Sequence, residues 1–207
     1  ATRNPADTKA LSNLAHALRA QGKLIEAASA YRAALSREDA VALRFTLADV
    51  LADLGELAAA EVELRNGLAS APDDVPARYT LGWVCQHQNR LKEARDCYEQ
   101  ALARDPQHAH AMNNLGLLLL ADEEYDKARA LFKRVITLQP DFAPAWRNLG
   151  QTFIALGHLD EAVASLERSI QLGSDAAEAW SDIGLIRARQ GRNKEAVEHF
   201  EQALRLK

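Results

Sequence analysis

Alanine recurs in this chain at an almost constant interval, and this interval constrains the fold more than any other feature. Successive members of the series are separated by 33, 34, 34, 34 and 34 residues. A fixed period in this range indicates one supersecondary unit that is copied and stacked, so that each copy buries its apolar face against its neighbours. The sequence therefore predicts a repeat protein with six copies, marked by Ala27, Ala60, Ala94, Ala128, Ala162 and Ala196.

Setting these alanines at position 20 of the repeat divides the chain into an N-terminal extension, residues 1–7, and a single array, residues 8–207. Position 8 then holds only alanine or glycine, whereas position 24 holds only leucine or an aromatic residue. A small residue on one helix admits a large side chain from a facing helix, so this alternation predicts two closely packed helices in each copy. The predicted repeats are 8–40, 41–74, 75–108, 109–142, 143–176 and 177–207.

The break between the two helices of a copy falls at position 15. Glycine there can adopt the left-handed conformation that ends a helix, and Asn89 can adopt it at small cost. Repeat four has Glu123 instead, so we expect its turn to be either differently shaped or slightly strained. Proline at position 32 starts the next copy, because proline is tolerated only in the first turn of a helix. The residues are Gly22, Gly55, Gly157 and Gly191 at position 15, and Pro72, Pro106 and Pro140 at position 32.

These columns resemble the tetratricopeptide repeat, which has a large apolar residue at position 4, leucine at 7, a small residue at 8, alanine at 20 and 27, an aromatic at 24 and proline at 32. The segments Trp146-Arg147-Asn148-Leu149-Gly150 and Trp180-Ser181-Asp182-Ile183-Gly184 match the opening signature of that family especially well. The resemblance covers residues 8–207 and implies an all-α fold, a right-handed α-solenoid of six helix-turn-helix repeats. It does not specify the function, because this scaffold serves many partners.

The charge and the motif content exclude several functional classes. The formal net charge is -4, and basic residues are not gathered on one helix face, so we expect no nucleic-acid partner. The longest apolar run, Leu115 to Ala121, is far too short to cross a bilayer. We therefore expect no membrane insertion and a cytoplasmic location. The sequence has no nucleophile motif and no phosphate-binding loop, which predicts no enzymatic activity in this chain and no cofactor.

Two pairs of reactive side chains have plain structural explanations. Cys85 and Cys97 fall in the same repeat, where they are interpreted as small core residues in a reducing compartment; a disulfide or redox switch is the alternative. His108 and His110 are two residues apart at a repeat junction, a spacing that suits no helical metal site. The sequence therefore predicts no bound metal.

The resemblance places positions 2, 5, 6, 9 and 12 of the first helix on the concave face of the superhelix. Position 6 is short and polar in every copy, and an asparagine amide can bond both the C=O and the N–H of an extended peptide backbone. The column resembles the asparagine ladder of the O-GlcNAc transferase superhelix and of kinesin light chain, with repeats four and five as the best rungs. Its members, all predicted to bind a partner, are Asn13, Thr46, Thr80, Asn114, Asn148 and Asp182.

Aromatic residues occupy the same face where the ladder weakens, and an aromatic patch in a groove is a plausible binding hot spot. The alternative is that these side chains only pack helix against helix. That alternative is preferred for Trp146 and Trp180, since position 4 requires a large residue, whereas both interpretations stay open for Trp83. The predicted partner-binding residues are Phe45 and Tyr79 at position 5, and Trp83 and Leu117 at position 9.

The carboxylate clamp of chaperone-binding tetratricopeptide domains does not fit this chain. It requires lysine, asparagine and arginine at fixed positions of three successive repeats, and Glu178 and Asp182 stand where cations are needed. A C-terminal acidic peptide is therefore a poor candidate partner. The mixed charge along the groove is expected to orient a ligand more than to strengthen its binding.

The leading functional hypothesis is a protein–protein interaction module that binds an extended peptide or partner segment in its concave groove. One alternative is the substrate-recognition region of a larger enzyme, for example a glycosyltransferase bearing such repeats. The other is a self-assembling scaffold, since the chain stops inside the second helix of repeat six and would leave Val197, Phe200 and Leu204 uncovered. Because the chain also begins without methionine, we expect that the natural protein is longer. We prefer this explanation of the uncovered edge to self-association through it.

Overall fold

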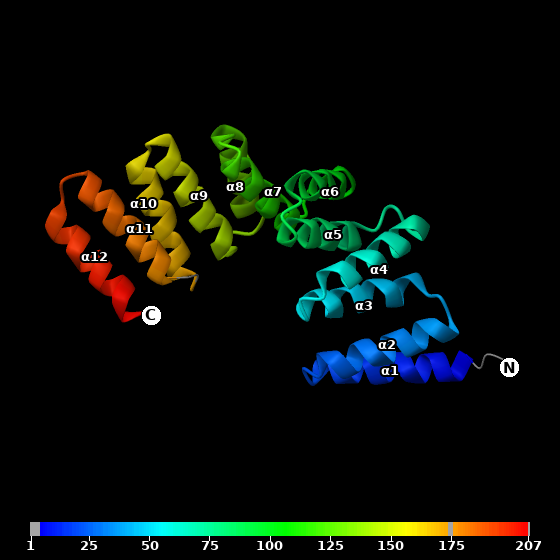
Figure 1. Ribbon diagram of the computed structural model, residues 1–207. Helices are drawn as coiled ribbons and strands as arrows, with labels where there is room; N and C mark the ends of the chain where they lie inside the picture. Colours follow the sequence, from blue (N-terminus) through cyan, green and yellow to red (C-terminus); the bar gives the residue numbers. More distant parts are fainter. Residues whose placement is uncertain (1–4, 174–175, 207) are drawn as a thin grey trace. The chain divides into compact units, whose positions relative to one another are not determined.

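The regular structure of this chain is helical throughout the residues that the computed structural model describes, 5–173 and 176–206 (Figure 1). Two helices correspond to each predicted copy, although the first helix begins at Pro5, inside the segment 1–7 that was expected to be an N-terminal extension. The helices are α1 (Pro5–Ala20), α2 (Leu24–Arg37), α3 (Val41–Asp53), α4 (Leu57–Ser70), α5 (Val75–His87), α6 (Leu91–Arg104), α7 (Ala109–Ala121), α8 (Tyr125–Leu138), α9 (Ala143–Leu156), α10 (Leu159–Gln171), α11 (Ala176–Arg189) and α12 (Asn193–Arg205).

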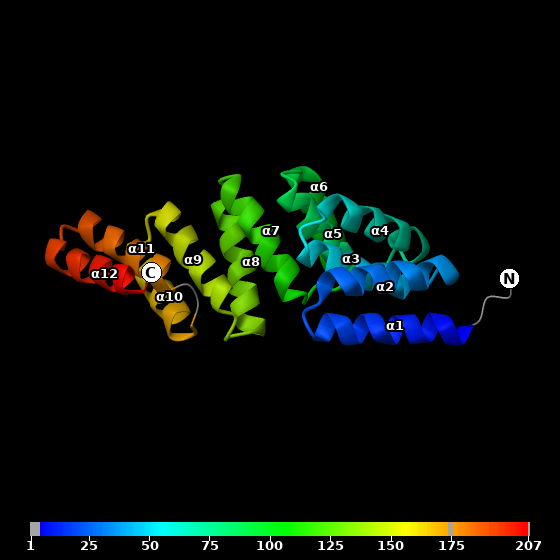
Figure 2. The same ribbon diagram turned by 60° about the horizontal axis from the view of Figure 1, so that its bottom comes forward.

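The helices pack in consecutive pairs, and the pairs form two compact units (Figure 2). The first unit, residues 1–106, contains α1 to α6, and the second, residues 107–207, contains α7 to α12. Within each unit the second helix of one pair packs on the first helix of the next, as α2 does on α3 and α8 does on α9. The division falls two residues before the boundary at 108/109 that the sequence predicts between repeats three and four.

Small and large residues interlock inside each pair as the alternation at positions 8 and 24 predicts. The six alanines at position 20 are between 0% and 3% exposed, so all of them belong to the core. In repeats three, four and six the aromatic ring at position 24 lies directly on the glycine at position 8. A Cβ atom added at Gly82 would stand 2.7 Å from Tyr98, and one added at Gly116 would stand 2.7 Å from Phe132. These contacts hold the two helices of a pair close together.

The turn inside each repeat keeps one shape, including in repeat four. Gly22, Gly55, Gly157 and Gly191 have φ between 74° and 78°, and Asn89 has φ 59°. Glu123 has φ 62°, and the amide of Glu124 bonds the carbonyl of Leu119 at 2.8 Å, as the equivalent amide does in the other repeats. Of the two outcomes expected for this turn, the structure shows the strained one. A non-glycine residue in this conformation costs roughly 1–2 kcal/mol, which the surrounding packing offsets.

The two cysteines are free and buried in the third repeat. Burial raises the pKa of the Cys85 thiol, and burial together with the neighbouring Cys85 raises the pKa of Cys97 to about 11. Thiols of this kind are poor nucleophiles at neutral pH. Their interpretation as core residues is therefore confirmed.

Candidate peptide-binding surface

Three of the predicted partner-binding residues lie together in a hollow of the first unit. The hollow has a volume of about 220 Å³ and is formed by side chains of α1, α3 and α5, which are the first helices of three successive repeats. Tyr79, Thr80 and Trp83 line it from α5. The other lining residues, Arg19, Asp49, Ala52 and Asp53, were not predicted as partner-binding residues. Asp49 stands in the same repeat column as Trp83. That shared column could have identified Asp49 as a residue of this surface.

The two aromatic side chains of this hollow, Trp83 and Tyr79, each contact a further ring. Trp83 is half-buried and stacks on His87, one helical turn later, with ring centroids 3.7 Å apart. The His87 Nδ1 atom lies 2.9 Å from the Trp83 carbonyl oxygen and forms a hydrogen bond with it. Tyr79 packs against the buried ring of Tyr98 at a centroid distance of 5.9 Å. The indole thus both contacts a neighbouring ring and lines the hollow, and its role in ligand binding stays a prediction.

The polar wall of the hollow carries more negative than positive charge. Thr80 Oγ1 donates a long hydrogen bond of 3.4 Å to Asp49 Oδ1, and Arg19 Nη2 lies 3.9 Å from Asp53 Oδ2. Burial raises the pKa of Asp49 above its ordinary value, although the Arg19 guanidinium and the Thr80 hydroxyl act to lower it. The Asp49 carboxylate is therefore only partly compensated by the groups around it.

Removing the charge of Asp49 is expected to stabilise the protein at neutral pH. A carboxyl whose pKa is higher in the folded than in the unfolded state favours folding at low pH, and this contribution is lost as the pH rises through the folded-state pKa. Asp49→Asn should therefore raise the free energy of unfolding at pH 7, and the gain should shrink as the pH falls toward 4. Urea denaturation at both pH values measures this difference. Asp96→Asn, which removes an exposed carboxylate from α6, should show no such gain.

The remaining predicted residues of the first unit lie outside this hollow. The Phe45 ring lies against Gly67 of α4, where an added Cβ would stand 2.3 Å from it, so Phe45 packs the helix pair of repeat two. Thr46 Oγ1 donates a 2.9 Å hydrogen bond to the Ala42 carbonyl of its own helix. Asn13 is exposed on α1. The structure thus brings Tyr79, Thr80 and Trp83 together in one hollow. Phe45, Thr46 and Asn13 do not line it.

The asparagines of the second unit bond one another. Asn148 is only 8% exposed, and its Nδ2 donates a 2.9 Å hydrogen bond to Asn113 Oδ1. Asn113 Nδ2 in turn lies 3.3 Å from Asn114 Oδ1. Asn113, which precedes Asn114 at position 5, was missed as a member of this chain of amides. Part of the hydrogen-bonding capacity assigned to the ladder is therefore used inside the protein, and peptide binding by these amides stays a prediction.

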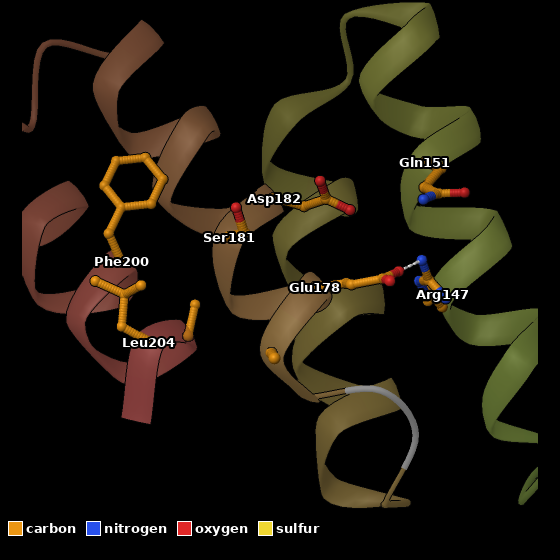
Figure 3. A pocket seen from close by; sticks show the side chains of 9 residues that line it. Arg147, Gln151, Glu178, Ser181, Asp182, Phe200 and Leu204 are labelled. Atoms are coloured by element: carbon orange, nitrogen blue, oxygen red, sulfur yellow. Dashed lines mark hydrogen bonds and ion pairs between the residues drawn. The ribbon is translucent and has the colours of Figure 1, made fainter. Parts of the chain in front are cut away.

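A second hollow, of about 420 Å³, lies between α9, α11 and α12 of the second unit (Figure 3). One side is apolar and includes Phe200 and Leu204, while Arg147 and Glu178 form an ion pair across the other side. Burial raises the pKa of Asp182, against the lowering effects of a hydrogen bond from Gln151 and the charge of Arg147. Asp182 is the predicted partner-binding residue in this hollow. Leu117 is half-buried on α7 and lines neither hollow.

The two other tryptophans have packing contacts of their own. Trp146 Nε1 donates a 2.9 Å hydrogen bond to the Pro140 carbonyl, and Trp180 stacks on His199 of α12 with ring centroids 5.2 Å apart. Neither of them lines the two hollows described above. Trp83 is thus distinguished from both by its position.

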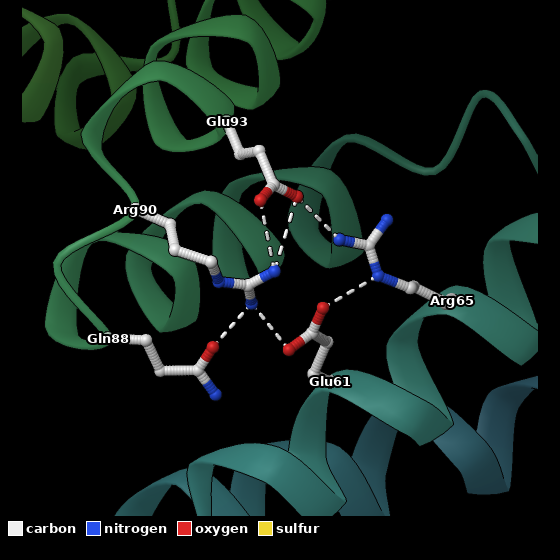
Figure 4. A network of polar contacts seen from close by, with 5 residues as sticks. All are labelled: Glu61, Arg65, Gln88, Arg90 and Glu93. Atoms are coloured by element: carbon white, nitrogen blue, oxygen red, sulfur yellow. Dashed lines mark hydrogen bonds and ion pairs between the residues drawn. The ribbon is translucent and has the colours of Figure 1, made fainter.

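A network of charged side chains joins repeats two and three away from these hollows (Figure 4). Glu61 of α4 accepts hydrogen bonds from Arg65, at 2.7 Å, and from Arg90, while Glu93 bonds both arginines. Gln88 also accepts from Arg90. Burial acts to raise the pKa of Glu61, but the hydrogen bonds from the two arginines outweigh it and hold this pKa below its ordinary value. Since its charges are mutually satisfied, the network links neighbouring repeats and is no candidate binding site.

The part of the chain described by the structure contains no group of three or more histidine, cysteine, aspartate or glutamate side chains that could hold a metal ion. Among the same residues, no helix has the length and apolar character that a membrane span requires.

Comparison with known proteins identifies the family. The model of a family described as the C-terminal domain of cilia and flagella-associated protein 70, which is a tetratricopeptide repeat model, matches residues 50–207. The general tetratricopeptide repeat model matches residues 12–76. The chain belongs to the tetratricopeptide repeat family. No curated protein sequence matches it.

Solved tetratricopeptide repeat structures share the fold at low sequence identity. A tetratricopeptide repeat protein from Parabacteroides merdae is 22% identical, with a TM-score of 0.74 over 98% of this chain and 80% of that chain. MamA from Desulfovibrio magneticus is 20% identical, with a TM-score of 0.74 over 81% and 95%. YrrB, described as a tetratricopeptide repeat protein with an unusual peptide-binding site, is 23% identical, with a TM-score of 0.71 over 87% and 93%. The prediction of an all-α solenoid of tetratricopeptide repeats is confirmed.

Proposed function

We propose that this tetratricopeptide repeat protein binds an extended segment of a partner protein along its first helices, with the hollow at Trp83 as an anchor point. The observation that carries the proposal is the convergence of α1, α3 and α5 on one hollow with a braced indole in its wall. The peptide-binding site ascribed to YrrB, which has the same fold, is consistent with it.

The size of the hollow favours a side chain over a small molecule. Small-molecule pockets usually have volumes of about 300–1,000 Å³, whereas the Trp83 hollow has about 220 Å³. Because it crosses three consecutive first helices, a chain that places one side chain in it would continue across the neighbouring repeats. Backbone hydrogen bonds to polar side chains on the first helices of the same unit, such as Asn13, would add about 0.5–1.5 kcal/mol each.

Replacing the indole should weaken partner binding far more than it affects folding. Burying such a ring on binding contributes roughly 1.5–3 kcal/mol, so Trp83→Ala is expected to raise the Kd of bound peptides at least about tenfold. The peptides are obtained by selecting a phage-displayed random decapeptide library on the wild-type protein, and their affinities are measured by fluorescence polarisation.

Val62→Ala is the matched control, because Val62 is an exposed apolar residue on α4, a second helix. It should leave both peptide affinity and Tm unchanged. Selected peptides that bind Trp83→Ala as tightly as the wild type would refute the proposal, as would a selection that enriches no peptide. A Trp83→Ala protein that is largely unfolded by circular dichroism would show that the indole is needed for packing, against the proposal.

A further inference from the structure

We infer that the Trp83 hollow receives a basic side chain, arginine or lysine, of the bound partner segment. The inference rests on the proposed function, since it names the chemistry of the residue that the hollow accommodates. It follows from the charge of the hollow, from the environment of Asp49 and from the aromatic wall.

The lining residues of the hollow carry two carboxylates and one guanidinium. Asp49 and Asp53 provide the carboxylates, and the negative charge of Asp74 adds to the field at Asp49. Arg19 is the one cation among the lining residues, and it lies 3.9 Å from Asp53. An opposing cation at Asp49 would complete the pairing of charges.

Asp49 is the carboxylate that would gain most from a ligand. It is half-buried, and its hydrogen bond from Thr80 is 3.4 Å long. Burial raises the pKa of Asp49, and the Arg19 charge and the Thr80 hydrogen bond, which act to lower it, do not cancel this effect. An ammonium or guanidinium would supply charge-assisted hydrogen bonds to the Asp49 carboxylate. An apolar side chain would remove the remaining water from this carboxylate without replacing its hydrogen bonds.

The aromatic wall makes a basic side chain fit better than any other polar one. A cation within about 6 Å of an indole centroid is attracted to the face of the ring, and the attraction grows when the site is shielded from water. The aliphatic stem of arginine or lysine can lie along Trp83 and Tyr79 while its charged end reaches Asp49. We expect arginine to be preferred to lysine, because a planar guanidinium can both stack on the indole and bond two carboxylate oxygens.

The larger hollow of the second unit lacks this chemistry. There Arg147 already pairs with Glu178, and Asp182 receives a hydrogen bond from Gln151. As at Asp49, burial raises the pKa of Asp182. This hollow differs in that its apolar side is formed by Phe200 and Leu204, and its lining residues include no tryptophan or tyrosine. The assignment of a basic ligand side chain is therefore limited to the hollow at Trp83.

The test uses synthetic decapeptides with the sequences enriched in the display selection on the whole chain. Each arginine is replaced in turn by citrulline, which keeps the shape and removes the charge, and each lysine by norleucine. We expect one basic residue in each peptide whose replacement raises the Kd at least about tenfold, which corresponds to about 1.4 kcal/mol. The effect should fall by several-fold between 50 and 300 mM salt because the pairing is partly exposed.

Asp49→Asn tests whether Asp49 pairs with the basic side chain of the peptide. The variant keeps an oxygen for the Thr80 hydroxyl, and the stability argument above predicts that it folds at least as well as the wild type. It should bind the unmodified peptide about tenfold more weakly and respond less than about twofold to the citrulline replacement. Asp96→Asn, with the same change of net charge on the exposed surface of α6, should behave as the wild type.

The possible failures are distinguishable. Peptides that depend on Trp83 but lack a basic residue, or that tolerate citrulline and norleucine at every position, would overturn this inference and leave the proposed function standing. Equal citrulline effects on the wild type and on Asp49→Asn would overturn it as well. A selection without enriched peptides, or peptides indifferent to Trp83→Ala, would overturn both.

Discussion

Ala128→Asp is expected to unfold repeat four, with a loss of about 3–5 kcal/mol in the free energy of unfolding. Ala128 is fully buried in α8, at the position where all six repeats have alanine. An aspartate there would place an unpaired carboxylate in a space sized for one methyl group, so the protein must either leave the charge unsolvated or separate the helices. Urea denaturation followed by circular dichroism measures the loss.

The matched control lies two residues away on the same helix. Ala130 is exposed, so Ala130→Asp changes the same residue type and the same charge with no burial, and should cost less than about 1 kcal/mol through helix propensity. Because each repeat contacts only its neighbours, amide exchange should accelerate first in α7, α8 and α9. Similar losses from the two variants would show that the alanine column does not mark the core.

Phe132→Ala is the second substitution with a large expected effect, about 3–5 kcal/mol of destabilisation. The Phe132 ring is fully buried, and its carbons lie 2.7 and 2.8 Å from the point where a Cβ at Gly116 would stand. Removing the ring leaves a cavity between α7 and α8 that the facing glycine backbone cannot fill. Equilibrium unfolding in urea gives the change in free energy.

Two further variants separate the loss of the ring from a general disturbance. Phe132→Leu should cost less than about 1.5 kcal/mol, since leucine occupies the same column at Leu64 and Leu166. Gly116→Ala should be better tolerated beside Phe132→Ala than beside the native ring, because the added methyl group then enters the vacated space. Independent, additive effects of the two substitutions would contradict the packing of Phe132 on Gly116.

The fold was predictable from the sequence because its determinants are local. Pairs such as Gly116 with Phe132, or Gly82 with Tyr98, join helices that are adjacent in the chain, so the same pairing appears in each copy as a small and a large column. The conformation of Glu123 could not be chosen from the sequence, since a glutamate can either adopt a left-handed turn at a cost or change its shape. The packing of the two helices on either side of Glu123 holds it in the left-handed conformation.

The binding surface was only partly predictable. Tyr79, Thr80 and Trp83 line one hollow because a single helix fixes their relation, and their role in binding stays a prediction. Phe45 stands in the same column as Tyr79, yet its ring packs on Gly67 of the second helix in its own repeat. Asn148 belongs to the predicted ladder, but its amide donates a hydrogen bond to Asn113 of the preceding repeat. The column pattern contains no signal for either contact.

The sequence by itself determined the repeat, the two helices of each copy, the residues that separate them and the face on which binding should be sought. Each of these follows from the order of small, large and helix-ending residues within 34 positions. Only the tertiary structure decided that Asp49, Thr80 and Trp83 share a hollow whose negative charge exceeds its positive charge. The hollow is assembled from side chains about 30 residues apart, and both their burial and their hydrogen bonds depend on how neighbouring repeats pack.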